Sequence, residues 1–126
     1  MKKLIKAVYL VFGSFAILYG SIALVMPTVL HSESARSFPL AHNLREQGAA
    51  AIFMGLMGLW CSLNYDRSLV VHYFLTFFAA LLSAIHWHDY FDGHLPFISP
   101  LYNTVPFLVF SAIAILRTRE TSLHPQ

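Results

Sequence analysis

Charged residues are scarce in this sequence. Only 11% of its 126 residues are Asp, Glu, Lys or Arg, whereas a soluble globular protein carries about 25%. Apolar residues make up 57% of the chain, and the mean hydropathy is +0.61. A chain with so few charges cannot cover this much apolar surface with polar groups, so we predict that lipid covers much of the protein.

A basic cluster and a second cysteine are also missing. Six acidic residues against eight basic ones give a net charge of +2, and no basic run extends beyond Lys2 and Lys3. Nucleic acid is excluded as a partner, because its recognition requires a concentrated basic surface. The single cysteine, Cys61, excludes an intrachain disulfide, and we interpret it as a small packing residue. The sequence shows no internal repeat or low-complexity segment.

What the chain does contain is four long apolar segments. They predict helices over residues of about 5–26, 38–64, 69–91 and 100–117. The first has no charge between Lys6 and His31, and its stretch of about 20 residues matches the ~30 Å bilayer core. The same run is longer than the apolar part of a secretory signal, so we favour a spanning helix over a cleaved one.

Helix-breaking and capping residues separate these segments. They are Pro27 and Ser37 before the second helix, Asn64 and Ser68 before the third, and Gly93 and Ser99-Pro100 before the fourth. A polar connection of residues 28–37 joins the first two helices. Pro106 should kink the fourth helix, and Arg117 should end it.

The distribution of basic residues predicts the orientation. Six lie on one side of the membrane (Lys2, Lys3, Lys6, Arg67, Arg117 and Arg119) and two on the other (Arg36 and Arg45). By the positive-inside rule, both termini are cytoplasmic. We therefore predict an all-α, integral membrane four-helix bundle that forms a single domain over residues 1–126.

Small residues recur at helical spacing on the first two helices. The stripes are Gly13, Ala16, Gly20 and Ala23 on one, and Gly48, Ala51, Gly55, Gly58 and Ser62 on the other. We interpret both as packing seams that face the bundle interior. The third helix carries a more polar stripe, which either lines a pocket or bonds to neighbouring helices: His72, Thr76, Ala79, Ser83, His86 and Tyr90.

The densest group of polar residues lies in the predicted outer connection, between Ser83 and Phe97. If the helix continues to Phe91, then His86 and His88 point in nearly opposite directions, and the neighbours are His86 with Asp89 or Tyr90 and His88 with Asp92. If the segment is extended, a site for zinc, copper, iron or haem becomes possible, with ligands His86, His88, His94 and Asp92. The simplest alternative is an interfacial belt of His and aromatic rings.

Glu46 is the second candidate. It follows His42 by four residues and precedes the small-residue seam, so it can point to the bundle mouth near His86 and Asp89. A carboxylate partly removed from water there suits proton transfer, with Glu46 and Asp89 as the catalytic pair. An ion pair of Glu46 with Arg45 or another cation is equally compatible with the sequence. His42, Glu46, His86 and Tyr90 are the residues expected to contact a ligand.

The stretch Leu44-Arg45-Glu46-Gln47-Gly48-Ala49-Ala50-Ala51-Ile52-Phe53-Met54-Gly55-Leu56 resembles the second helix of DoxX-like small membrane proteins. The similarity in layout covers about residues 4–117. It implies a bacterial inner-membrane location, and no assigned activity for most members, although a few are linked to quinone-dependent oxidation as small subunits. It transfers no catalytic residue to this chain.

Three functional hypotheses follow. The first is a non-catalytic module that binds a lipid-like, quinone-like or other hydrophobic ligand, or that belongs to a larger membrane complex or homo-oligomer. The second is a metal or haem protein built on His86, His88 and His94. The third is a membrane enzyme that uses Glu46 and Asp89 for acid–base chemistry on a hydrophobic substrate. The sequence identifies no cofactor.

Overall fold

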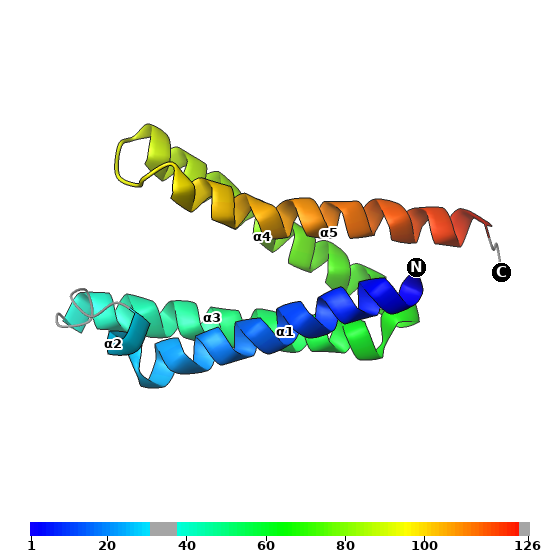
Figure 1. Ribbon diagram of the computed structural model, residues 1–126, viewed down its shortest axis with the longest axis horizontal. Coiled ribbons are helices and arrows are strands. Elements are labelled where there is room, and N and C mark those ends of the chain that lie inside the picture. The colour runs from blue at the N-terminus through cyan, green and yellow to red at the C-terminus, as the bar shows by residue number, and fades with distance from the viewer. Residues whose placement is uncertain (31–37, 124–126) are drawn as a thin grey trace. The chain divides into compact units, whose positions relative to one another are not determined.

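The computed structural model describes residues 1–30 and 38–123. Their secondary structure is helical, with short turns between the helices, which confirms the all-α prediction (Figure 1). The chain divides into two compact units, Met1–Ser68 and Leu69–Gln126. Each unit contains an antiparallel pair of long helices.

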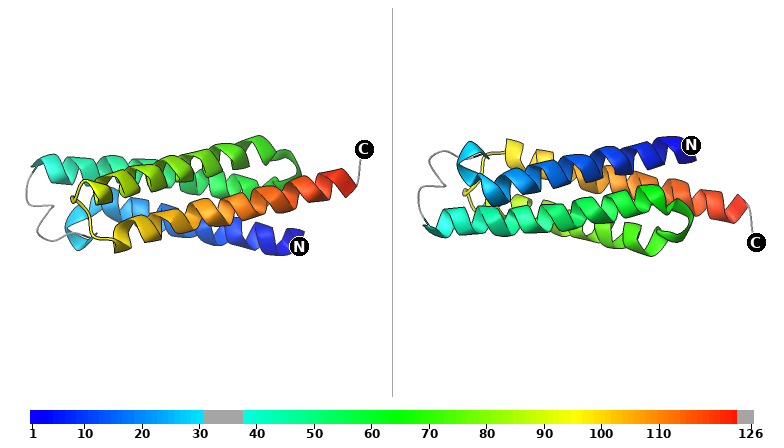
Figure 2. Two further views of the ribbon diagram at one scale, coloured as in Figure 1. Left: turned by 90° about the horizontal axis from the view of Figure 1, so that it is seen from above. Right: turned by 90° about the horizontal axis from the view of Figure 1, so that it is seen from below.

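The first unit consists of α1 (Lys2–Val25), α2 (Pro27–Leu30), α3 (Phe38–Leu63) and the 3-10 helix η2 (Tyr65–Arg67). α1 and α3 run side by side in Figures 1 and 2. α1 begins earlier than predicted, because lysine is a good helix former even where it cannot enter lipid. Met26 leaves the helical conformation, as a residue before proline tends to do, and Pro27 then opens α2.

α2 occupies the start of the predicted polar connection. The remaining features predicted there lie outside the described residues: His31, Glu33, Arg36 and the capping role of Ser37. α3 starts at Phe38 and ends one residue before Asn64, close to the predicted bounds. The Asn64 amide donates to the Trp60 carbonyl at 3.3 Å, so this residue does satisfy an acceptor at the end of the helix.

The two small-residue seams pack against each other. A Cβ atom added to Gly13 would lie 2.7 Å from the Gly55 carbonyl oxygen, and one added to Gly55 would lie 2.7 Å from the Gly13 oxygen. The same reciprocal contact recurs between Gly20 and Gly48, at 2.5 and 2.7 Å. Backbones approach this closely only where side chains are absent. The seams therefore hold α1 and α3 together.

At one end of this pair, polar bonds join the start of α1 to the end of α3 and to η2. The Lys2 ammonium contacts both carboxylate oxygens of Asp66 at 2.7 Å and lies 5.4 Å from the centre of the Tyr65 ring. The Ser62 hydroxyl donates to the Lys6 carbonyl at 2.9 Å. Ser68, predicted as a cap for the following helix, directly precedes that helix, which starts at Leu69, and its hydroxyl donates to the Tyr65 carbonyl at 3.0 Å.

The second unit consists of α4 (Leu69–Phe91) and α5 (Ile98–Leu123). α4 has the predicted bounds. α5 starts before Ser99, contains Pro106 and extends past Arg117, where the sequence predicted its end. The difference at Arg117 has a simple cause: charge limits how far a helix enters lipid, but arginine and glutamate do not break a helix.

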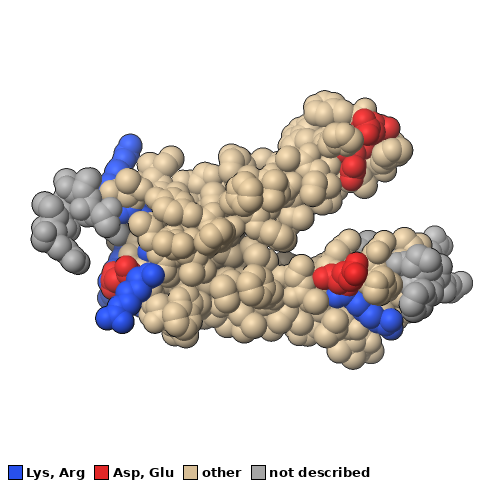
Figure 3. All heavy atoms as spheres, turned by 180° about the vertical axis from the view of Figure 1, so that it is seen from behind, with Lys and Arg blue, Asp and Glu red and all other residues tan. Residues whose placement is uncertain are grey.

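Three helical segments are long and apolar enough to cross a membrane: α1, α4 and residues 98–119 of α5. Within the described part of the chain α3 is not among them, since its first half contains the polar residues Arg45, Glu46 and Gln47. On the face that Figure 3 shows, the charged side chains lie near the ends of the helices. Many large apolar side chains on α1 and α4 are exposed, Phe15 and Phe74 among them. These are features of a membrane protein.

Candidate functional site

The polar residues between Ser83 and Phe97 lie at the end of α4 and in the turn to α5. α4 ends at Phe91, and Gly93 two residues later has a φ of +77°, a left-handed conformation that glycine adopts without strain. The His94 amide donates to the Asp89 carbonyl at 2.8 Å, and the Gly93 amide donates to the Tyr90 carbonyl at 3.0 Å. These two bonds define a Schellman motif. The helix is therefore fully formed at His86 and His88.

The helical conformation separates the two histidines. Residues two apart on a helix point about 200° apart around its axis, so His86 and His88 cannot bind one ion together. The extended conformation on which the metal hypothesis depended is not adopted here. Over residues 1–30 and 38–123, no group of three or more His, Cys, Asp or Glu side chains is placed to hold a metal ion.

His86 faces α5. Its Nδ1 lies 2.9 Å from the Ser99 hydroxyl, and the ring is half-buried. Ser99 was predicted to cap the fourth helix, but it lies inside the first turn of α5, where its hydroxyl bonds to the imidazole. This bond orients the ring. Nε2 has no hydrogen-bond partner among the residues that the structure describes.

A second polar group on the same face centres on Thr104. Its hydroxyl donates to the Pro100 carbonyl at 2.7 Å, which uses its single proton. The Thr104 oxygen accordingly accepts from the Trp87 indole N–H at 3.0 Å and from the Ser83 hydroxyl at 2.8 Å. The polar groups of Ser83, Trp87 and Thr104 therefore all form hydrogen bonds at the Thr104 hydroxyl, between α4 and α5.

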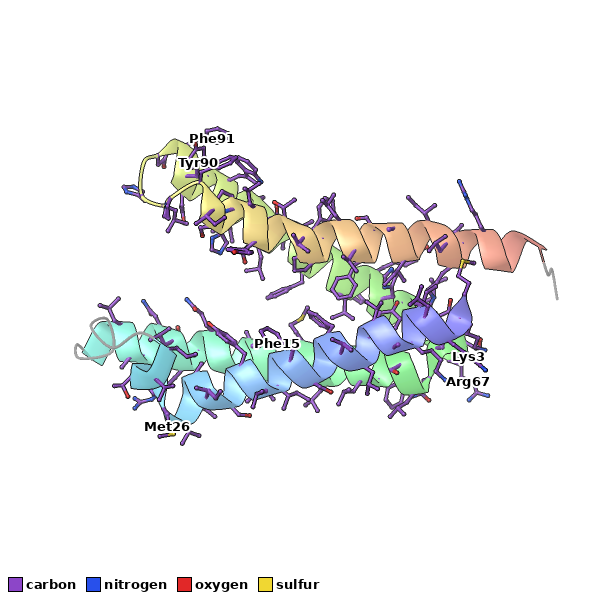
Figure 4. All side chains as sticks on the ribbon, in the orientation of Figure 1. Lys3, Phe15, Met26, Arg67, Tyr90 and Phe91 are labelled. Carbon is purple, nitrogen blue, oxygen red and sulfur yellow. The ribbon has the colours of Figure 1, made fainter. Side chains whose placement is uncertain are left out.

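Aromatic rings cover the turn beside this network. The Trp87 and Phe97 rings meet edge to face at 6.0 Å between centroids, and the Tyr90 and Phe97 rings lie 5.5 Å apart. Phe91 stands 5.8 Å from Trp87. Figure 4 shows Tyr90 and Phe91 at this end of α4. The cluster of Trp87, Tyr90, Phe91 and Phe97 has the composition of an interfacial aromatic belt.

The remaining polar residues of the turn are more exposed. His88 Nδ1 lies 3.3 Å from an Asp92 carboxylate oxygen and 3.7 Å from one of Asp89. The pair of His88 and Asp92 is the one that helical spacing predicted. Both residues lie near the open end of the helix, and His94 is exposed as well. Such contacts are weak because water competes for them.

Glu46 and His42 meet on the first turns of α3. Nε2 of His42 lies 3.2 Å from Glu46 Oε1, and the Glu46 side chain is 67% exposed. The His42 imidazole is therefore a group that contacts this carboxylate. Glu46 belongs to the first unit and Asp89 to the second, so their convergence as a catalytic pair, and that of the four ligand-contacting residues, stays a prediction.

The polar stripe of α4 bonds partly within the helix and partly to α5. The Thr76 hydroxyl donates to the carbonyl of His72 at 2.9 Å, and the His72 ring stands edge-on to Phe110 of α5 at 6.1 Å. His72, Ala79 and Ser83 are buried. Of the two alternatives for this stripe, bonding between helices is the one seen at Ser83.

Sequence reasoning overlooked the α5 residues of the network. Ser99 was assigned to a cap, and Thr104 and Asn103 were not singled out. A signal existed: Asn103 and Thr104 are polar residues in an apolar helix, and such residues seek partners on a neighbouring helix. Thr104 did so, while Asn103 donates its amide to the Ser99 carbonyl at 3.0 Å.

No family model, curated protein or solved structure matches this chain, so a functional proposal has to start from its own geometry.

Proposed function

We propose that the protein is a multi-pass protein of the bacterial inner membrane, in which α1, α3, α4 and α5 form one bundle with both termini in the cytoplasm. Each helix pair supports this orientation by itself. In the first unit, Lys2 and Asp66 are bonded, so Lys3 and Arg67 lie at the same end, as Figure 4 shows. In the second unit, the antiparallel helices carry Asp89 and Asp92 at one end and Arg117 and Arg119 at the other. Each pair is thus more basic at one end, as the positive-inside rule requires.

Within this bundle the protein acts as a non-catalytic module that binds a lipid-like or quinone-like amphiphile, either alone or as an accessory subunit of a membrane complex. One observation carries the proposal: the ring of His86 is oriented by Ser99 and keeps Nε2 available for a ligand. A ring nitrogen that is partly shielded from water and has no hydrogen-bond partner is unfavourable in lipid, and a ligand that forms a hydrogen bond with it removes this cost.

The bond between His86 and Ser99 leaves two possible hydrogen-bonding roles for Nε2 of the imidazole. If Nδ1 donates to the serine oxygen, Nε2 is an acceptor, and if the serine donates to Nδ1, Nε2 carries the proton. The imidazole can therefore bond to either a carbonyl or a hydroxyl group. An uncharged head group that carries one of these suits the site. The aromatic cluster at the same end of α4 adds flat apolar surface for a ring or chain.

The orientation is tested with reporter fusions. A reporter that is active only outside the cytoplasm, inserted between Asp92 and Leu95, should be active, whereas the same reporter fused after Gln126 should be inactive. The reverse pattern would contradict the proposed topology. A protein that remains in the supernatant after membranes are pelleted would contradict membrane insertion.

Ligand binding is tested on the protein purified in mild detergent. Organic extraction followed by mass spectrometry should find one amphiphile in stoichiometric amount, and His86→Phe should reduce that amount by about two- to tenfold, the equivalent of one hydrogen bond to the ring. His88→Phe is the matched control, because this ring lies two residues further on the same helix and on the opposite side. Circular dichroism checks that both variants are folded. Equal occupancy in both variants would refute the site.

A further inference from the structure

The basic end of the first unit carries more positive charge than its own carboxylate can balance. Four cations lie at this end, Lys2, Lys3, Lys6 and Arg67, against the single carboxylate of Asp66 within the described residues, so the net charge is 4 − 1 = +3. Glu46, the other acid described in this unit, belongs to the opposite end of α3.

One of the four cations is already engaged. Lys2 makes two contacts of 2.7 Å to Asp66 and lies over the Tyr65 ring. Tyr65 itself is buried, and the Ser62 to Lys6 bond fixes the adjacent turns of α1 and α3. This arrangement leaves the side chains of Lys3 and Arg67 exposed next to a rigid support. Figure 4 shows both at the same end of the unit.

Exposed apolar side chains adjoin these cations. Leu4 is 70% exposed and Leu63 is 78% exposed. From Leu4, exposed aliphatic residues continue at every seventh position along α1, which is one side of a helix: Val11, Leu18 and Val25. A cationic end followed by an apolar row matches a molecule with an anionic head and a long acyl chain.

We propose that Lys3 and Arg67 bind the phosphate of an anionic phospholipid, with its acyl chain along the row from Leu4 to Val25. The inference rests on the proposed membrane location, but not on the ligand site at His86. Lipid is favoured over a soluble anion because the apolar row begins at the same helix turn as the cations. Each basic residue near an anionic membrane surface attracts its lipids by about 1 kcal/mol.

The chain contains a natural probe for this site. Trp60 lies on α3 one turn before Leu63, is 52% exposed, and is one of only two tryptophans. In a Trp87→Phe background it is the sole tryptophan, and lipids with brominated acyl chains quench its fluorescence on contact. We expect brominated phosphatidylglycerol to quench Trp60 more than brominated phosphatidylcholine at equal mole fraction in vesicles. Far-UV circular dichroism of each variant establishes that it is folded.

Substitutions then change this preference in two directions. Lys3→Gln and Arg67→Gln should each reduce the preference for the anionic lipid by about fivefold, the equivalent of ~1 kcal/mol per cation. Asp66→Asn should increase it, because the patch gains one net positive charge. A merely structural role of the Lys2 and Asp66 pair would not produce this increase. Arg45→Gln, which removes an exposed cation from the opposite end of α3, is the control and should leave the preference unchanged.

Each contrary outcome has a defined meaning. Equal quenching by the two lipids would overturn the inference and leave the membrane location intact. Absence of quenching by either lipid would overturn both. Competition by inorganic phosphate, at ionic strength matched with sodium chloride, would assign the patch to a soluble anion and overturn the lipid site.

Discussion

The contact between Gly13 and Gly55 makes a quantitative prediction about the pairing of α1 and α3. In Gly55→Ala, the new Cβ would lie 2.7 Å from the Gly13 carbonyl oxygen, whereas ordinary contact begins at 3.4 Å, so the backbones have to separate by up to 3.4 − 2.7 = 0.7 Å. Overpacking of this kind costs about 1–3 kcal/mol. Alanine also favours the helix over glycine by about 1 kcal/mol, which offsets part of that cost.

Gly58→Ala is the matched control. Gly58 lies on the same helix as Gly55, so alanine brings the same gain in helix propensity. The new Cβ would lie 2.9 Å from Cδ1 of the Phe12 ring, and the nearest backbone atom is 3.3 Å away. The ring can shift, and a backbone carbonyl cannot do so alone. Gly55→Ala should therefore be less stable than Gly58→Ala by about 1–2 kcal/mol.

The free energy of unfolding is measured in mixed micelles by titration with sodium dodecyl sulfate, with far-UV circular dichroism as the signal. Gly13→Ala should behave like Gly55→Ala, and the double variant should cost less than the sum of the two, because the helices need to separate only once. Equal stability of Gly55→Ala and Gly58→Ala, or strict additivity in the double variant, would refute the close backbone contact.

Three further predictions use the same titration. Gly93→Ala should lower the free energy of unfolding by about 1–2 kcal/mol. Nothing lies within 4 Å of the new Cβ, so this loss comes from the strain of a left-handed backbone at a residue that has a Cβ. An unchanged free energy of unfolding would contradict the left-handed conformation of this turn. Thr104→Val should lower the free energy of unfolding by about 1–3 kcal/mol and shift the Trp87 emission, because the indole N–H and the Ser83 hydroxyl lose their shared acceptor. Thr118→Val, at an exposed position of the same helix, is the control. Equal effects of the two substitutions would argue against the network at Thr104. Lys2→Gln should lower the free energy of unfolding by at most about 1 kcal/mol, because the ion pair with Asp66 is exposed to water, and high salt should abolish the difference from the unsubstituted protein. A larger loss that does not depend on salt would show that the pair is shielded from water.

The helices themselves were predictable because their signals are local. Runs of apolar residues, prolines and Gly93 placed the four long helices, and the spacing of Gly13, Gly20, Gly48 and Gly55 identified the seams. Errors arose where a local signal has two meanings. Arg117 limits insertion into lipid but does not end a helix, and Ser99 resembles a cap although its hydroxyl bonds to another helix.

The candidate site was only partly predictable. His86 and the pair of His88 and Asp92 could be identified from helical spacing once the helix was assumed to reach Phe91. The partners of His86 and Trp87 could not, because Ser99 and Thr104 lie 13 and 17 residues further along the chain, and the pairing depends on how α5 is set against α4. The sequence allowed an ion pair of Glu46 with Arg45 or another cation, and it did not identify His42 as the residue that contacts this carboxylate.

The sequence by itself determined that the chain is helical, where each apolar helix lies, and which faces carry small residues, because these properties depend on neighbours within a few turns. Only the tertiary structure decided that the glycines of α1 and α3 contact each other in pairs, that Thr104 is a shared acceptor, and that Nδ1 of His86 contacts Ser99 of the next helix. Those features depend on the distance and register between helices. Register is set by the packing of many side chains at once, and no single segment of sequence specifies it.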